Sequence, residues 1–476
     1  MKIFVVMHVF NNFGGIINHN EQLCAGLKEL GHDVTFAFIK PTKTPQKTEL
    51  DYTLKEGYEI GVGTGYPVHQ GKGWICPYYA LKNSDDIARF VNDANAHDLV
   101  IWQSIFGFKN SETEKFLDWT PMIEDVTAKQ IVVIHDGNLI KNYSWIYKFQ
   151  HKFSGLACVH PSAVKSAEFM TIPRNLILNP QDLSKIKHPT IEGRENKILS
   201  LQTFKRWKRV DNLVAAVPYI DGEIIVAGDG IERNYMTSVD KCKPEYYCTK
   251  QLDPTAGDDR LNKPIWQNAL NSNRYSYIGF ITEQKRDEIL DSCKFLLDPS
   301  WSMNYGEHFN RVLVDSMING VVPIARNYGV SDNVSGIGEV FKPGENYLMI
   351  PHDATPKEFG DLVNRFFNLS DEEYIKIVET NNKKLKSFDR MKIAEQFINL
   401  AFGADNAGEY ETPLIGKENP EVKKIADKMW KEHFELEEVF SLDNFFWEQE
   451  KGSRSSLFCF IPETNYYIKF LTVKIL

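Results

Sequence analysis

The sequence has no run of eighteen or more apolar residues, and it therefore predicts no helix that crosses a membrane. Its first residues, MKIFVVMH, lead directly into an apolar strand. They lack the basic segment, the longer apolar core and the small-residue cleavage site of a secretory signal peptide. We therefore expect a cytoplasmic protein.

Cysteine is scarce, and the cysteines are scattered along the chain. No two of them form a C-x-x-C pair, so no zinc site or thiol-redox motif is indicated. An odd, dispersed set is typical of reduced structural thiols and not of a disulfide framework. The seven residues are Cys24, Cys76, Cys158, Cys242, Cys248, Cys293 and Cys459.

An excess of basic residues is also missing. Acidic residues number 64 against 55 lysines and arginines, which gives a formal net charge of −9. This balance argues against a protein whose whole surface grips nucleic acid, although it leaves room for a local basic face. With 42% hydrophobic and 25% charged residues, the composition is that of a soluble globular protein. The length of 476 residues exceeds one ordinary core and predicts two domains.

The first half of the sequence alternates apolar strands with helical segments. Residues 2–10 are almost continuously apolar, which is typical of a parallel strand buried on both faces. A turn at 11–15, a helical segment that stops at Gly31 and a strand at 34–39 complete a βαβ unit, which favours a doubly wound sheet. Further strands are expected at 98–103, 130–136, 156–161 and 175–180.

A second alternating series begins at residue 197. Its strands are expected at 197–204, 223–230, 276–281, 294–299 and 321–327. We therefore predict an α/β protein with two Rossmann-like domains. Helices over 372–403 would close the second half, and the aromatic-rich last residues would form a packed extension and not a disordered tail. The predicted divisions are 1–185, 186–385, a closing helix at 386–403 and the extension at 404–476.

Polar residues at the carboxyl ends of the predicted strands are candidate site residues, because ligands of open α/β sheets bind there. Gly14 and Gly15 lie between the first strand and a helix, where a turn without side chains and free helix amides can approach a phosphate. His135 and Asp136 follow the apolar run IVVI and could orient a sugar or relay a proton. Each pair also has a structural interpretation, as an ordinary tight turn or as a loop histidine beside a helix cap.

The stretch TFKRWKR at 203–209 places four cations at the end of the first strand of the second series. At a binding cleft, Lys205, Arg206 and Lys208 would neutralise a diphosphate. The alternative interpretation is a solvated basic turn.

The stretch GEHFNRVLVDSMINGVVPI at 306–324 carries an acid on each side of a predicted loop-to-helix boundary. Glu307 lies in the loop, and Asp315 lies on the helix that follows. Carboxylates so spaced can contact different parts of one extended ligand, and they accept paired hydrogen bonds from vicinal hydroxyls. A sugar nucleotide is such a ligand.

The same stretch resembles the E-x7-E region of retaining glycosyltransferases with the GT-B fold, in which two Rossmann-like domains face each other across a cleft. Glu307 takes the position of the first glutamate, and Asp315 replaces the second. The GG turn, GHDV, LNP and the KR-VDNLVAA run match the family in the same order. The resemblance covers about residues 1–400, which leaves the extension without a counterpart.

The resemblance implies a nucleotide-sugar donor, with UDP as the expected nucleotide, and neither a metal nor another cofactor. Lys208, with Lys205 or Arg206, would stabilise the diphosphate leaving group, while Glu307 would position the sugar and Asp315 the ribose. The implied catalytic residues are His135, Asp136 and Glu307. The implied donor-binding residues are Gly14, Gly15, Lys205, Arg206, Lys208, His308, Phe309, Asn310 and Asp315.

Three departures from the family motif bear on the donor site. His308 and Asn310 replace two motif glycines, which would crowd the donor sugar or select a different one. Thr203 stands where the family has an arginine, so that Lys205 or Arg206 would supply the missing charge.

A narrower resemblance is to the DNA α-glucosyltransferases of T-even-type phages, which modify hydroxymethylcytosine. MKIFVVMHVF, VNDANAHDLVIWQS, VVIHDG, the Trp207-Lys208 pair and GIERNYMTSVDKCKPEYY echo that family in order. It implies double-stranded DNA with hydroxymethylated bases as the acceptor, reached by flipping the target base. The transferred sugar would be glucose or a pentose such as arabinose, and a phage-encoded protein would act in the host cytoplasm.

Three alternatives remain open. The same chemistry could act on a surface polysaccharide or a lipid-linked glycan, with WICPYYALK at 74–82 as the membrane-facing stretch. A GT-B epimerase would form product without an acceptor alcohol, and a phosphorylase would require phosphate. A sugar-nucleotide-binding protein without activity would account for the lost arginine and glycines.

Overall fold

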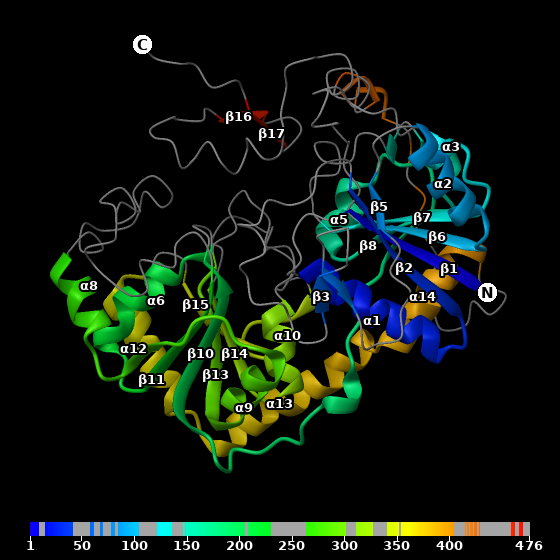
Figure 1. Cartoon of the computed structure of the whole chain (residues 1–476). Coiled ribbons are helices and arrows are strands. Elements are labelled where there is room, and N and C mark those ends of the chain that lie inside the picture. The colour runs from blue at the N-terminus through cyan, green and yellow to red at the C-terminus, as the bar shows by residue number, and fades with distance from the viewer. Residues whose placement is uncertain are drawn as a thin grey trace.

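The computed structural model shows two α/β domains and parts of a C-terminal extension (Figure 1). The residues that it describes are 1–8, 15–40, 58–60, 67–69, 78–80, 84–103, 121–135, 146–147, 149–204, 208–229, 263–300, 311–326, 340–351, 354–403, 415, 417, 419–421, 423–425, 428, 458–461 and 466–469.

The first sheet is parallel throughout, with the strand order β5-β2-β1-β6-β7-β8-β9. All strands expected from the first half are present, most of them a few residues shorter than predicted. The prediction missed β5, because three residues are too few to show a period. The strands are β1 (Lys2–His8), β2 (Asp33–Lys40), β5 (Tyr78–Ala80), β6 (Leu99–Gln103), β7 (Lys129–Ile134), β8 (Gly155–Cys158) and β9 (Arg174–Leu176).

The second sheet is also parallel and has the order β12-β11-β10-β13-β14-β15. In both sheets the first strand lies inside and the order reverses beside it, which is the doubly wound topology that the sequence predicted. Only the short β15 was not anticipated. The strands are β10 (Glu195–Thr203), β11 (Glu223–Asp229), β12 (Tyr275–Tyr277), β13 (Cys293–Asp298), β14 (Val322–Arg326) and β15 (Leu348–Ile350).

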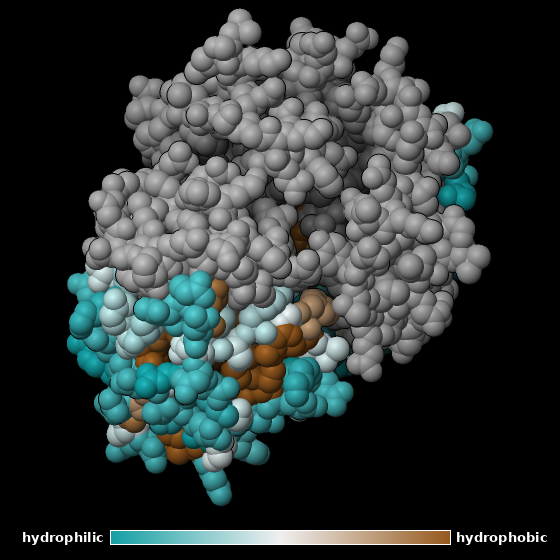
Figure 2. All heavy atoms as spheres, turned by 60° about the vertical axis from the view of Figure 1, so that its left-hand side comes forward, coloured by the Kyte–Doolittle hydropathy of each residue, from teal (hydrophilic) through white to brown (hydrophobic). Residues whose placement is uncertain are grey.

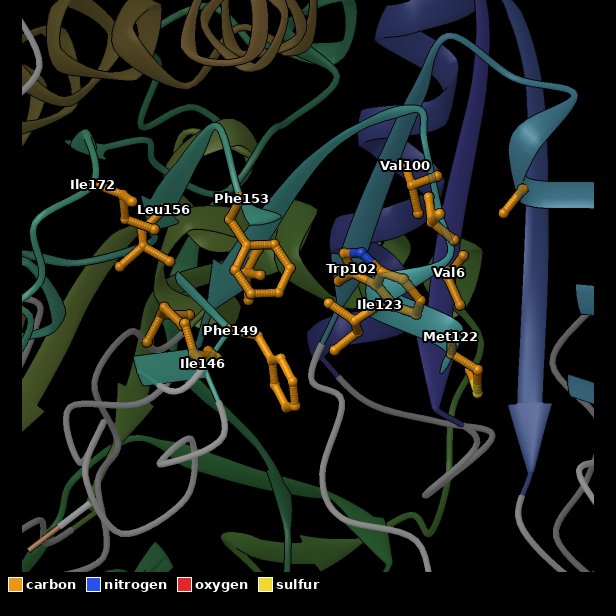
Figure 3. Close-up of a cluster of buried hydrophobic side chains, with 14 of the residues drawn as sticks. Val6, Val100, Trp102, Met122, Ile123, Ile146, Phe149, Phe153, Leu156 and Ile172 are labelled. Atoms are coloured by element: carbon orange, nitrogen blue, oxygen red, sulfur yellow. The ribbon is translucent and has the colours of Figure 1, made fainter. Parts of the chain in front are cut away.

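Helices cover both faces of the first sheet, and the strand residues alternate between two cores. Ile3 and Val5 face α1 (Gly15–Glu29) and α14 (Arg390–Phe402). Phe4 and Val6 face α2 (Ser84–Asn95) and α3 (Pro121–Glu124) on the opposite side. Figure 3 shows part of this second core around Trp102. Burial on both faces explains why these strands are continuous apolar runs.

The second sheet is covered in the same manner. On one face lie α6 (Val210–Ala216), α8 (Lys263–Leu270), α12 (Pro356–Phe367) and most of α13 (Asp371–Leu385). On the other face lie α9 (Glu283–Ser292) and α10 (Arg311–Ile318). In this orientation of the molecule, the exterior of the described parts is mostly hydrophilic, with smaller hydrophobic areas (Figure 2).

The helix α14 corrects one prediction. The sequence analysis assigned all helices of 372–403 to the second half, but Ile393, Phe397 and Leu400 belong to the core of the first sheet. The contact with α1 is close, because a Cβ added at Gly26 would lie 2.3 Å from the carbonyl oxygen of Arg390. The chain therefore returns from the second domain to complete the first.

The two segments that pass between the domains are bound to each other. Gln181 N donates to Phe388 O (2.8 Å), and Arg390 N donates to Gln181 O (3.1 Å). The guanidinium of Arg390 also pairs with Glu29 on α1 and with Asp182 (3.2 Å). These bonds connect the outgoing and returning chain at one place.

The described parts of the extension include contacts with the first domain. Lys417 N donates to Glu168 O (3.2 Å), and Ile425 packs against the core that contains Trp102. The extension also contains an antiparallel pair, β16 (Phe458–Ile461) and β17 (Tyr466–Lys469). A second such pair, β3 (Tyr58–Ile60) and β4 (Pro67–His69), lies in the first half of the chain.

None of the helices found in the described residues has the length and hydrophobicity needed to span a membrane. Cys24, Cys158 and Cys293 are buried free thiols, as predicted. Burial raises the pKa of Cys158 and of Cys293 to about 12, which keeps both protonated at neutral pH.

Candidate active site

The carboxyl ends of β6 and β7 hold a pair of buried polar side chains. His135 follows β7 directly, and its Nε2 donates to Oε1 of Gln103, the last residue of β6 (2.7 Å). Gln103 is fully buried, and its Nε2 has no hydrogen-bond partner in the part of the chain that the structure describes. The predicted site residue His135 therefore lies where the topology places ligands.

His19 of α1 joins this pair from the side. Its ring meets the ring of His135 edge-on, with the centroids 4.8 Å apart, and contacts Phe397 of α14 on another side. The Nδ1 atom of His19 bonds with Oδ1 of Asn179 (2.8 Å). Since that oxygen only accepts, the ring carries its proton on Nδ1 and presents a lone pair at Nε2.

Both histidines are held in the neutral form. Burial lowers the pKa of His19 to about 4; the bond with Asn179 opposes this effect, and the charge of Arg311 adds to it. Burial, followed by the neighbouring His19 and His160, holds the pKa of His135 well below its usual value. Neutral imidazoles at pH 7 offer one donor and one acceptor each, which suits uncharged hydroxyl groups.

The second domain has a different chemistry at its corresponding end. Asp315 of α10 is 8% exposed, and its Oδ2 accepts from Nη1 of Arg286 on α9 (2.9 Å). Its Oδ1 lies 3.6 Å from Nε of Arg311, one turn earlier on α10. Arg286 also donates to Asp287 (2.8 Å). The predicted ribose ligand is therefore part of an ion cluster, formed by Arg286, Asp287, Arg311 and Asp315, and its contact with ribose stays a prediction.

The basic turn after β10 divides into residues with different environments. Lys208 is half-buried and lies five residues after the end of β10. Arg209 is 1% exposed, and its guanidinium donates to Asp211 (3.0 and 3.2 Å) and Asn212 (2.8 Å). This fourth cation of the stretch is therefore turned into the protein and paired, and it does not add a free charge to the surface.

Strand ends in the second sheet are also fixed by a buried carboxylate. Asp298 ends β13 and is fully buried, and its Oδ1 accepts from Nε2 of Gln202 (2.7 Å) and from N of Ser300 (3.0 Å). These bonds tie the carboxyl ends of β10 and β13 together at the point where the strand order reverses.

Several predicted site residues lie outside the described residues. Gly15 is described as the first residue of α1, which agrees with a turn that opens a helix. No cluster of three or more histidine, cysteine or acidic side chains that could hold a metal occurs in the described ranges. The predicted site residues outside these ranges are Gly14, Asp136, Lys205, Arg206, Glu307, His308, Phe309 and Asn310.

Sequence reasoning missed four polar residues that the structure places around the predicted ones. His19 lies five residues beyond the start of the Gly14-Gly15 turn, and Gln103 ends a predicted strand. Both positions carried a signal, because each is polar where a strand or helix reaches the carboxyl edge of the sheet. Arg286 and Arg311 carried no comparable signal, since an arginine on a predicted helix is usually solvated.

The second domain matches a known family. Residues 183–384 match the family model described as "Glycosyl transferases group 1". No curated protein matches the chain.

Three solved structures illustrate the similarity of the whole fold. HepE of Anabaena, in complex with UDP-glucose, is 14% identical, with a TM-score of 0.54 over 84% of this chain and 98% of the other. An α-glucosyltransferase in complex with UDP-glucose and DNA containing an abasic site is 12% identical, with a TM-score of 0.56 over 84% and 99%. The lipopolysaccharide outer core galactosyltransferase WaaB is 13% identical, with a TM-score of 0.51 over 84% and 99%.

Identities this low show a shared fold and not a shared substrate. Residues 183–384 are therefore similar to the glycosyl transferases group 1 family, and the chain has the GT-B fold.

Proposed function

We propose that the protein is a retaining glycosyltransferase that moves a sugar from a UDP-sugar to an acceptor hydroxyl. The observation that carries this proposal is the contrast at the carboxyl ends of the sheets. The first domain presents the neutral histidines His19 and His135, while the group 1 domain presents Lys208 and the ion cluster. Neutral hydrogen-bonding groups suit a sugar and an acceptor alcohol, and cations suit a diphosphate.

The predicted charged residues of the second domain would bind the donor. Lys208, with Lys205 or Arg206, would stabilise the negative charge that develops on the diphosphate leaving group. This electrostatic stabilisation requires no metal ion. Glu307 would position the donor sugar, and Asp315 would contact the ribose through Oδ1, since Oδ2 is taken by Arg286.

The first domain would complete the reacting centre. His135 would contact the transferred sugar near the reacting carbon through Nδ1, because its Nε2 is bound to Gln103. Asp136 would orient the sugar or the acceptor. Domains that close on the donor would exclude water and suppress hydrolysis.

For the acceptor we propose a hydroxymethylated cytosine in double-stranded DNA, which receives glucose or a pentose. Two observations support this choice: the sequence resemblance to phage DNA α-glucosyltransferases, and the fold likeness to an α-glucosyltransferase bound to DNA at a TM-score of 0.56. A flipped base would present its hydroxymethyl group to the neutral first-domain histidines.

A surface glycan is the second candidate acceptor. The fold likeness to a lipopolysaccharide galactosyltransferase, at a TM-score of 0.51, favours it. In this alternative the donor chemistry is unchanged, and only the acceptor alcohol differs.

Incubation of the protein with labelled UDP-glucose or UDP-arabinose tests the proposal. The acceptors would be DNA with hydroxymethylcytosine, unmodified DNA and a lipopolysaccharide core oligosaccharide. We expect label on the hydroxymethylated DNA alone, in the α-configuration by NMR and undiminished by EDTA. Label on the oligosaccharide alone would select the second acceptor, and no transfer with any pair would contradict a transferase.

A further inference from the structure

His19 has one hydrogen-bonding atom that its surroundings leave unused. The side chain is 1% exposed, and its Nδ1 is committed to Asn179. The Nε2 atom is buried and accepts no hydrogen bond from any described residue. Leaving a buried acceptor unpaired is unfavourable, because the atom has lost its bonds to water without replacement, so such atoms in folded proteins usually have a function or a bound partner.

Arg311 has unused donors on the opposite domain. Its side chain is 15% exposed at the first turn of α10, and its Nε and Nη1 are buried without a hydrogen-bond acceptor among the residues described. The nearby Asp315 does not satisfy them, because its carboxylate bonds with Arg286 instead and stays 3.6 Å from Nε of Arg311. A buried guanidinium with open N–H groups is suited to an anion.

The two side chains approach each other across the domain boundary. Asn179, which holds His19, follows Leu178, and Leu178 packs against both the core of the first sheet and the core that contains α10. The positive charge of Arg311 acts on His19 and lowers its pKa. Figure 1 shows α10 beside α1 where the domains meet. An acceptor on one domain and cationic donors on the other thus share one region.

This arrangement has the polarity of a sugar attached to a phosphate. A phosphate oxygen would accept from Arg311, and an adjacent sugar hydroxyl would donate to Nε2 of His19. An anion alone would leave His19 unpaired, because the lone pair at its Nε2 repels an anion. A neutral sugar at His19 alone would leave the buried Nε and Nη1 of Arg311 without a hydrogen-bond acceptor. Both groups are satisfied only by a ligand that carries the two chemistries side by side.

We propose that Arg311 and His19 bind the sugar–phosphate end of the donor from opposite domains, Arg311 through a phosphate oxygen and His19 through a hydroxyl of the transferred sugar. This inference rests on the proposed function and adds two binding residues to it. Arg311 would then act on the diphosphate together with Lys208 and with Lys205 or Arg206.

Calorimetric titration of the full-length protein with UDP-glucose, UDP and uridine separates the two contacts. Arg311→Gln should lower the affinities for UDP and for UDP-glucose by about 30-fold each, because a charge-assisted hydrogen bond to phosphate is lost. The affinity for uridine should not change. His19→Phe, which keeps an aromatic ring, should lower the affinity for UDP-glucose by about 10-fold and leave the affinity for UDP unchanged.

Matched variants control for general effects. Arg274→Gln removes an arginine that is 48% exposed at the opposite end of the second sheet, and His151→Asn removes an exposed histidine of the first domain. Neither should change any of the three affinities. Arg311→Lys keeps the charge and should recover part of the affinity for UDP, which a merely structural role of Arg311 would not produce.

The outcomes distinguish this inference from the proposed function. If the wild-type protein binds UDP-glucose and both site variants bind it equally well, the inference is overturned and the proposed function stands. If Arg311→Gln lowers the affinities for uridine and UDP equally, the inference is also overturned, since equal losses would indicate a distorted nucleoside site. If the wild-type protein binds neither UDP-glucose nor UDP, both fall together.

Discussion

The carboxyl ends of the two sheets are alike in topology and opposite in electrostatics. Each lies where the strand order of a doubly wound parallel sheet reverses. At the first, His19 and His135 are buried and neutral, and Gln103 retains an unused donor. At the second, Arg286 and Asp315 form an ion pair in which both side chains are at most 14% exposed.

This difference shows how one architecture, used twice, supports two kinds of recognition. Topology determines where a ligand binds, because helices and strand ends converge at the same edge. The side chains at that edge determine what binds there. In the proposed function, the neutral edge would bind hydroxyl groups by hydrogen bonds, whereas the charged edge would bind phosphate and ribose. Four experiments test this contrast.

The largest expected effect is at the charged edge. Asp315→Ala removes the carboxylate between Arg286 and Arg311 and leaves two largely buried cations without it, which should lower the free energy of unfolding by about 4 kcal/mol. Asp287→Ala is the control: Asp287 is 29% exposed, so its substitution should lower the free energy of unfolding by only about 1 kcal/mol. Urea unfolding measures both. Equal losses of unfolding free energy in the two variants would show that Asp315 contributes no more to stability than the more exposed Asp287.

The neutral histidines should make the free energy of unfolding depend on pH below neutrality. Unfolded His19 takes up a proton as the pH falls through 6.5, whereas folded His19, facing His135 and Arg311, does so only near pH 4. The free energy of unfolding should therefore fall between these pH values by about 3 kcal/mol through this residue. His19→Asn should flatten that part of the pH dependence, measured by urea unfolding at successive pH values. An unchanged slope in the variant would refute the neutral assignment.

Catalysis should depend on the neutral edge more than donor affinity does. His135→Asn removes the group proposed to position the transferred sugar, and kcat/KM for transfer should fall by about 100-fold. Affinity for UDP should change little, because the diphosphate is assigned to the other domain. Transfer of labelled sugar and titration with UDP measure the two quantities. A parallel loss of UDP affinity would argue against the division between the edges.

The smallest expected effect concerns the buried cation beside Lys208. Arg209 has φ 49°, a left-handed conformation that costs a non-glycine residue about 1 kcal/mol. Arg209→Gly removes this strain together with the bonds to Asp211 and Asn212, so that stability should change by less than about 1 kcal/mol. Arg209→Lys keeps the strain but loses the paired donors, and it should be the less stable variant in thermal unfolding.

The sequence predicted the candidate site unevenly, and the reason differs between residues. His135 and Lys208 were identified because each follows an apolar strand, and strand ends define the ligand edge. His19 escaped notice because it lies inside a helix, where a polar residue normally faces solvent. Arg311 was overlooked although it lies four residues before Asp315, since its open donors become apparent only when Arg286 is seen to occupy the carboxylate.

The two α/β series and their parallel sheets follow from the amino-acid sequence, because strands buried on both faces must be continuously apolar and their connections must be long. The three-dimensional structure was needed to show that α14 packs with α1 in the first domain and that the charge of Arg311 acts on His19 across the boundary. Local periodicity reports that a face is buried but not which sheet buries it. The partner of a charge likewise depends on distances that chain order does not specify.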